Sequence, residues 1–121
     1  MRMKITFDKK SKFDYTVRRD GKPVGSLSVI RPTIYDPGIM KFRDFRTGVR
    51  GERNGFSVPD SKQLIRWFYE RLEGTVGWVT VDDTYEFREI LSYHKIHKFF
   101  NEDHQFFFYD EEELTAARLL V

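Results

Sequence analysis

Apolar and polar side chains alternate in short runs along the N-terminal half of the chain. One run covers residues 3–7, the next covers 13–17 and a third covers 26–29. Alternation with a period of two is typical of a β-strand that has one face in water. Asp20-Gly21 lies between the second and third runs, and this dipeptide predicts a tight hairpin. We therefore expect an antiparallel meander in this half of the chain.

After residue 58 the apolar positions change to a helical spacing. They recur every three or four residues over 60–73 and again over 83–100, which predicts two helices. The apolar runs at 75–81 and 105–109 are typical of buried strands, because a strand covered on both faces loses its alternation. A strand, an 18-residue helical link and a second strand predict a right-handed crossover that makes the two strands parallel.

Local signals predict where these helices begin and where the first one ends. Asp60 stands three residues before Gln63, and Asp83 stands three residues before Glu86, as in a capping box. Gly74 is placed to end the first helix in a left-handed conformation. The first helix is therefore expected to lie between Asp60 and Gly74.

Together these elements predict an α+β fold in a single domain over residues 1–121. An antiparallel β-meander, with its last strand over 39–45 and a loop over 47–57, is followed by helix, strand, helix and strand. The crossover would give a mixed sheet with two main helices packed on it. The glutamates at 111–113 favour a further short helix at the end.

Charge divides the chain although its net charge is only +2. Residues 1–58 hold 14 Lys/Arg against 6 Asp/Glu, a net of +8, whereas residues 59–121 hold 7 against 13, a net of −6. Such a split indicates two electrostatically distinct surfaces. Two interpretations are open: the basic half packs near the acidic half, or it offers a surface to an acidic partner.

Cysteine usage and hydropathy exclude several classes of protein. The chain has no cysteine, which excludes a disulfide framework and thiol chemistry. No stretch approaches the roughly 20 apolar residues of a membrane span, so we expect no membrane partner. With no signal-peptide pattern at the start, the cytoplasm is the expected compartment.

Two segments of the chain have the character of a known enzyme family. Residues 15–25 read YTVRRDGKPVG and form the predicted hairpin, and residues 93–100 read YHKIHKFF near the end of the second helical pattern. With the order of elements over residues 12–109, they resemble the GNAT acyltransferase family. The resemblance implies an N-acyltransferase in which Tyr93 is the general acid that protonates the leaving thiolate.

Acetyl-CoA is the cofactor that this resemblance implies. Its phosphates would bind in the loop before the first helix, at Arg50, Arg53, Asn54, Gly55, Phe56 and Ser57. The family's loop reads Gln/Arg-x-x-Gly-x-Gly/Ala, and the glycines of this chain stand at other positions. Pro59 also removes one amide close to the helix start. A solvated connection with two arginines is the alternative interpretation of the loop.

The alternative function is that of a non-catalytic interaction protein, such as a phage-type inhibitor or accessory protein. It would bind a protein or a nucleic acid through a charged face. Basic and aromatic residues are interleaved between 42 and 56, a mixture that single-stranded nucleic acid binding uses. The basic members are Arg43, Arg46, Arg50 and Arg53, and the aromatic members are Phe42, Phe45 and Phe56. No recognised nucleic-acid motif accompanies them.

Three further clusters have plainer interpretations. His94, His97 and His104 do not have a recognised zinc spacing, and we interpret them as surface or partly buried residues. The acidic cluster over 82–89 is interpreted as helix capping. The three consecutive aromatic residues at 67–69 cannot all face one core, so we expect at least one of them to be exposed.

Overall fold

The computed structural model describes residues 3–30 and 38–121, and the chain forms two compact units. Unit 1 is Met1–Glu70 and unit 2 is Arg71–Val121, and each contains one β-sheet. The α+β fold is confirmed. The single domain over residues 1–121 stays a prediction.

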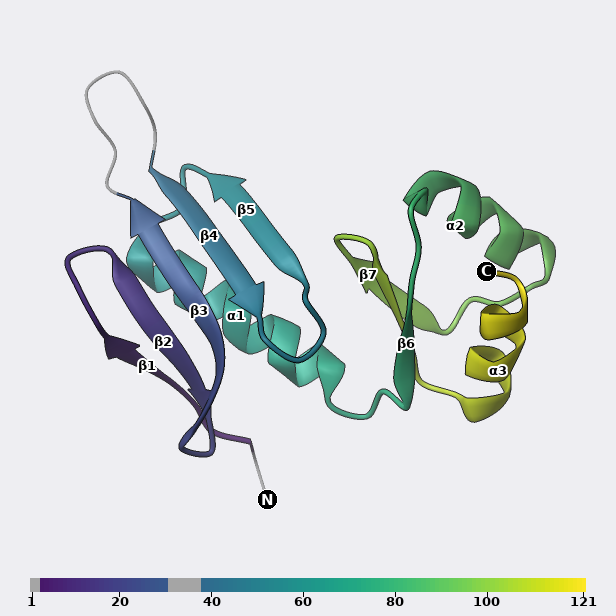
Figure 1. The fold of residues 1–121 in the computed structure, drawn as a ribbon, viewed down its shortest axis with the longest axis horizontal. Coiled ribbons are helices and arrows are strands. Elements are labelled where there is room, and N and C mark those ends of the chain that lie inside the picture. The colour runs from purple at the N-terminus through teal and green to yellow at the C-terminus, as the bar shows by residue number, and fades with distance from the viewer. Residues whose placement is uncertain (1–2, 31–37) are drawn as a thin grey trace. The chain divides into compact units, whose positions relative to one another are not determined.

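Unit 1 contains a five-stranded sheet in the order β1-β2-β3-β4-β5, in which every neighbouring pair is antiparallel (Figure 1). The strands are β1 Ile5–Lys9, β2 Asp14–Arg19, β3 Lys22–Ile30, β4 Ile39–Asp44 and β5 Arg50–Asn54. The predicted meander is therefore confirmed. The loop predicted over 47–57 is wrong at β5, because this strand pairs with β4 through its backbone and has no apolar pattern to reveal it.

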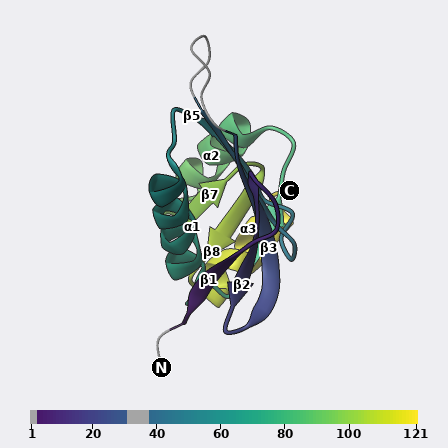
Figure 2. The same cartoon turned by 90° about the vertical axis from the view of Figure 1, so that its left-hand side faces the viewer.

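The helix α1, Val58–Leu72, covers one face of this sheet (Figure 2). Alternate residues of the central strands point to that face and are buried, among them Val17, Leu27 and Met40. Phe42 lies against two aromatic rings of the helix, with ring centroids 5.6 Å from Phe68 and 6.0 Å from Tyr69. This layer is the hydrophobic core of unit 1.

The start of α1 differs from the prediction. The hydroxyl of Ser57 accepts a hydrogen bond from the backbone N–H of Asp60 at 3.2 Å and donates to its carboxylate at 2.8 Å. Ser57 is therefore the capping residue, and Asp60 is its partner three residues later. Pro59 lies in the first turn, where its missing N–H costs no helical hydrogen bond. Gly74 adopts φ +89° after the helix ends at Leu72, as predicted.

Unit 2 contains a three-stranded sheet in the order β6-β8-β7 and two helices. Its elements are β6 Gly77–Thr80, α2 Thr84–Tyr93, β7 Phe99–Glu102, β8 Gln105–Phe108 and α3 Glu111–Leu119. The predicted parallel pair and mixed sheet are wrong, because Trp78 pairs with Phe107 in an antiparallel register. Both sheets are antiparallel.

An unpredicted hairpin is the reason for this difference. The helix predicted over 83–100 ends at Tyr93, and β7 then returns through a two-residue turn into β8. Asp103 in that turn has φ 54°, a left-handed conformation that Asp tolerates better than most residues. The hairpin reverses the chain once more than expected, so β8 runs opposite to β6.

The core of unit 2 lies between its helices and one face of its sheet. Phe106 of β8 meets Phe87 of α2 with ring centroids 5.0 Å apart, and Leu114 of α3 packs in the same cluster. Asp83 caps α2 by accepting from the N–H of Glu86 at 2.9 Å, as predicted. The short terminal helix is also confirmed. Among the described residues, no helix is long and apolar enough to cross a membrane.

Candidate functional site

The face of the five-stranded sheet that points away from α1 is polar. We call this surface the open face, and its members alternate with the core residues along each strand. Its charged and hydroxyl-bearing residues include Asp8, Asp14, Thr16, Arg18, Ser26, Ser28, Lys41, Arg43, Arg50 and Glu52. An antiparallel sheet with one solvated face leaves such a surface available to a ligand.

Two arginines face each other across the open face. Arg43 of β4 is directly opposite Arg50 of β5, and Ser26 of β3 is opposite Arg43 on its other side. Side chains directly opposite each other in a sheet have Cβ atoms about 5 Å apart, so like charges there are destabilising. Both arginines are exposed, and neither has an ion-pair partner within the part of the chain that the structure describes.

Two other basic residues on the open face have an acidic residue opposite or beside them. Lys41 is directly opposite Glu52 in the register of β4 and β5. Arg18 forms an ion pair with Asp8 on the neighbouring strand. The pair of Arg43 and Arg50 is therefore a local concentration of positive charge that the sheet itself does not neutralise.

An exposed aromatic side chain lies next to this pair. Phe45 follows β4 and is 52% exposed, and its N–H still donates to the carbonyl of Val24 on β3 at 2.9 Å. Because the strand pairing continues to this point, Phe45 shares a face with Arg43, two residues earlier. Arg46 is exposed in the turn that follows. We call Arg43, Phe45, Arg46 and Arg50 the arginine site.

A buried carboxylate holds the turn of the arginine site. Asp44 is 1% exposed and accepts three hydrogen bonds: from the Tyr69 hydroxyl at 2.6 Å, the Thr47 N–H at 2.8 Å and the Thr47 hydroxyl at 2.6 Å. Burial, followed by the hydrogen bond and the charge of Asp44, raises the pKa of Tyr69 above its ordinary value. The phenol therefore remains a neutral donor and ties α1 to the turn between β4 and β5.

Gly25 makes room for this arrangement. A Cβ atom at this position would lie 2.7 Å from the carbonyl oxygen of Arg43 and 3.1 Å from the hydroxyl of Tyr69. No side chain fits there without displacing backbone. The roles of Asp44, Tyr69 and Gly25 were not predicted from the sequence. The available signal was the inward position of Asp44, which continues the alternation of Met40 and Phe42.

The residues predicted to bind acetyl-CoA do not gather at one point. Arg50 lies on the open face, whereas Arg53, three residues along the same strand, lies on the opposite face of β5. Asn54 ends the strand, and Gly55 adopts φ +73° immediately after it. Ser57 already bonds the helix-terminal amide that a phosphate would need.

Tyr93, the predicted general acid, is the last residue of α2 in unit 2, and it is 84% exposed. The predicted cofactor residues belong to unit 1. Acyl-CoA binding and the catalytic role of Tyr93 stay predictions.

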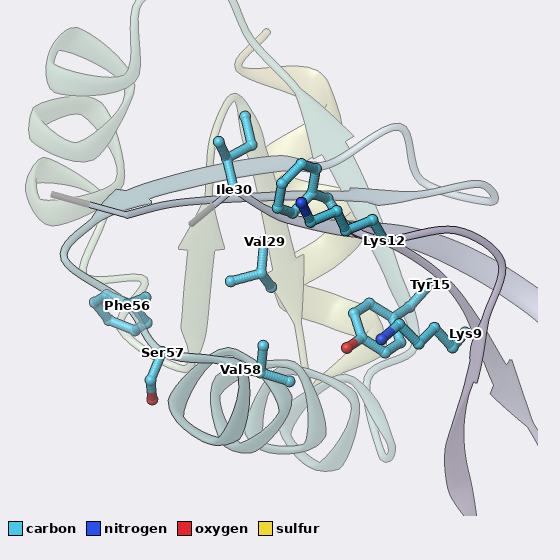
Figure 3. Close-up of a pocket in the computed structure, with 9 residues that line it drawn as sticks. Lys9, Lys12, Tyr15, Val29, Ile30, Phe56, Ser57 and Val58 are labelled. Carbon is cyan, nitrogen blue, oxygen red and sulfur yellow. The ribbon is translucent and has the colours of Figure 1, made fainter. Parts of the chain in front are cut away.

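Phe56 and Ser57 line a pocket of about 210 Å³ near the start of α1 (Figure 3). The other lining residues come from β1, the turn that follows it, β2 and β3. They are Lys9, Lys12, Phe13, Tyr15, Val29 and Ile30, together with Val58 of α1. This pocket was not predicted, because the turn between the first two strands and the loop before α1 are far apart in the sequence.

The remaining clusters have local roles or stand apart. All three histidines are exposed, and among the described residues no group of three His, Cys, Asp or Glu side chains is arranged to hold a metal ion. Trp67 is 49% exposed whereas Phe68 and Tyr69 are buried, which confirms that the aromatic triplet does not face one core.

The comparison with protein-family models found no match, and the searches of curated proteins and of solved structures found none either.

Proposed function

We propose that unit 1 binds single-stranded nucleic acid, without catalysis, through the arginine site on its open face. The observation that carries this proposal is the uncompensated cross-strand pair of Arg43 and Arg50 beside the exposed ring of Phe45. Guanidinium groups bind phosphate oxygens through two parallel hydrogen bonds. An exposed aromatic ring stacks with an unpaired base, whatever its identity. The site thus combines the two contacts that sequence-independent binding of single strands uses.

The distribution of charge supports an acidic partner for this unit. Unit 1 holds 16 Lys/Arg against 8 Asp/Glu, a net of +8, and unit 2 holds 5 against 11, a net of −6. The change of sign therefore follows the boundary between the units. A net positive unit attracts a polyanion over a distance of about a Debye length, roughly 8–10 Å at physiological salt.

The buried anchor supports a preformed site. Asp44 fixes the turn between Phe45 and Gly48 from within the core, and Gly48 completes the turn with φ +77°. Less ordering entropy is then lost when the arginines and Phe45 meet a ligand. The site is short, so we expect dissociation constants of about 1–100 µM, the range of non-specific binding at physiological salt.

Fluorescence anisotropy with a labelled oligo(dT) and a labelled oligo(U) tests the proposal directly. We expect both probes to bind, with affinity that falls as salt rises, at a slope near −2 if about three phosphates are contacted. The double variant Arg43→Glu, Arg50→Glu should lose about tenfold or more in affinity. Phe45→Ala should weaken binding with little change in the salt slope, since stacking is not ionic.

A matched control separates the site from the overall charge of the unit. Lys4 and Lys10 are exposed and flank β1, the edge strand opposite β5. Lys4→Glu, Lys10→Glu makes the same change in net charge, and we expect it to retain most of the affinity. An equal loss in the control and the Arg43, Arg50 variant would assign binding to net charge alone. Absence of binding by the wild-type chain at low salt would reject the function.

A further inference from the structure

We infer that the pocket near the start of α1 binds a small carboxylate with a short apolar chain. We call it the Tyr15 pocket, and its lining is that of Figure 3. Its volume of about 210 Å³ is below the roughly 300–1,000 Å³ of pockets for drug-sized ligands, which favours a small occupant. The inference does not depend on nucleic acid binding, because the arginine site uses other residues.

The pocket has two chemically different walls. Val29, Phe56 and Val58 form an apolar wall on one side, whereas the side chain of Ile30 points to the other face of β3 (Figure 3). The other side is formed by β1, the turn after it and β2. From there the side chains of Lys9, Lys12 and Tyr15 extend into the pocket (Figure 3), and the ammonium nitrogen of Lys12 lies 5.4 Å from the centroid of the Phe13 ring. Few polar groups that converge on an apolar cavity are typical of a site that orients a small ligand.

The positive charge at this wall is not neutralised by the acids of the same hairpin. Asp8 is paired with Arg18 on the open face. Asp14 accepts hydrogen bonds from the hydroxyls of Ser11 at 2.6 Å and Ser28 at 2.5 Å, which lower its pKa from the ordinary value of 3.8. Lys9 has no ion-pair partner among the described residues. An incoming carboxylate would supply that partner.

A further cation, Lys62, lies against the ring of Tyr15. The ammonium nitrogen of Lys62 on α1 lies 5.2 Å from the centroid of the Tyr15 ring and 5.5 Å from that of Phe7. The carboxylate of Asp60 accepts a hydrogen bond from Ser57, so it takes part in the helix cap. The electrostatic potential at the Tyr15 pocket is therefore positive, which favours an anionic ligand over a neutral or cationic ligand of the same shape.

The ligand class follows from these two walls. The ammonium groups and the phenol would bind the two carboxylate oxygens, and a chain of a few methylene groups would lie on the apolar wall. Hexanoate has this composition. For a ligand of this size we expect a dissociation constant of about 1–10 mM.

A titration of the ¹⁵N-labelled full chain with hexanoate, followed by amide chemical shifts, tests the inference. We expect saturable shifts confined to residues 9–15, 29–30 and 56–58. Hexanamide, which keeps the chain and loses the charge, should bind several-fold more weakly. Acetate, which keeps the charge and loses the chain, should give no saturable shift at about 10 mM.

Variants of the polar wall complete the test. Lys9→Ala, Lys12→Ala should weaken hexanoate binding about tenfold, and Tyr15→Phe should weaken it by less. Lys4→Ala, Lys10→Ala removes the same charge outside the pocket and should bind hexanoate as the wild type does. The spectra also report whether each variant is folded.

Three outcomes would overturn the inference: no saturable shifts with hexanoate, equal affinities for hexanoate and hexanamide, or the same loss in the Lys4, Lys10 control. Nucleic acid binding is tested by Arg43→Glu, Arg50→Glu, which should bind hexanoate normally. The two proposals are tested with different variants and ligands, so one can fail without the other.

Discussion

The two sheets of this protein use their faces differently. The five-stranded sheet of unit 1 buries one face under α1 and exposes a charged open face. In the three-stranded sheet of unit 2, all four residues of the central strand β8, Gln105–Phe108, are buried. Phe107 stacks on Phe100 with centroids 4.9 Å apart, on the face opposite to Phe106. The central strand of this sheet therefore offers no exposed side chain to a ligand, whereas the open face of unit 1 offers a charged row of them, and the candidate site lies there.

The largest expected effect tests the packed sheet. Phe106 is 0% exposed and contacts Phe87 and Phe99, so Phe106→Ala leaves a cavity. We expect the free energy of unfolding to fall by about 3–5 kcal/mol. Ser26→Ala, on the open face of the other sheet, should change it by no more than about 0.5 kcal/mol. Urea denaturation measures both, and similar losses would contradict the difference between the sheets.

The next effect tests the buried anchor beneath the open face. Asp44→Ala removes the acceptor of the Tyr69 hydroxyl and of Thr47. We expect a loss of about 2–3 kcal/mol in stability, because buried donors are left unsatisfied. We also expect weaker binding of oligo(dT), since the turn that carries Phe45 loses its support. Tyr69→Phe is the milder control, because it removes only one of these hydrogen bonds. If the folded Asp44→Ala variant binds oligo(dT) with unchanged affinity, Asp44 does not position the arginine site.

A smaller effect distinguishes a binding site from a structural surface. Arg43→Gln, Arg50→Gln removes two like charges that face each other across β4 and β5. We expect stability to rise by about 0.2–1 kcal/mol, because repulsion is relieved. Affinity for oligo(dT) should fall in the same variant. A loss of stability instead would indicate that the two arginines support the sheet.

The smallest expected effect concerns acetyl-CoA. A ligand at about 100 times its dissociation constant adds roughly 2.7 kcal/mol of stability. Because Arg50 and Arg53 lie on opposite faces and Ser57 occupies the helix cap, we expect millimolar acetyl-CoA to leave the midpoint of thermal unfolding unchanged. A clear increase in the midpoint would support the acyltransferase hypothesis, and Tyr93→Phe would then test the general acid.

Part of the fold and part of the candidate site could be predicted from the sequence. The first three strands, α3 and the cap of α2 at Asp83 were predictable, because alternation, helical spacing and local capping are encoded within a few residues. The strands β5 and β7 were missed. In β5 the residues are polar at an edge, and in β7 the phenylalanines fit a helical spacing as well as a strand.

The arginines of the candidate site were identified from the sequence, but their arrangement was not. In the sequence, the four arginines between residues 43 and 53 could not be distinguished from one another. Register then placed Arg43 opposite Arg50 and turned Arg53 to the other face. A shift of one residue in pairing would exchange the faces, and no local signal determines it.

The sequence by itself determined the elements that depend on neighbours along the chain: the alternating strands, the helical stripes and the division of charge. Tertiary structure alone decided what depends on distant partners. These are the direction of β8 relative to β6, the burial of Asp44 under Tyr69, and the pocket between Tyr15 and Val58. The physical reason is that strand pairing and buried hydrogen bonds join groups many residues apart. These interactions stabilise the protein only once the distant segments have come together.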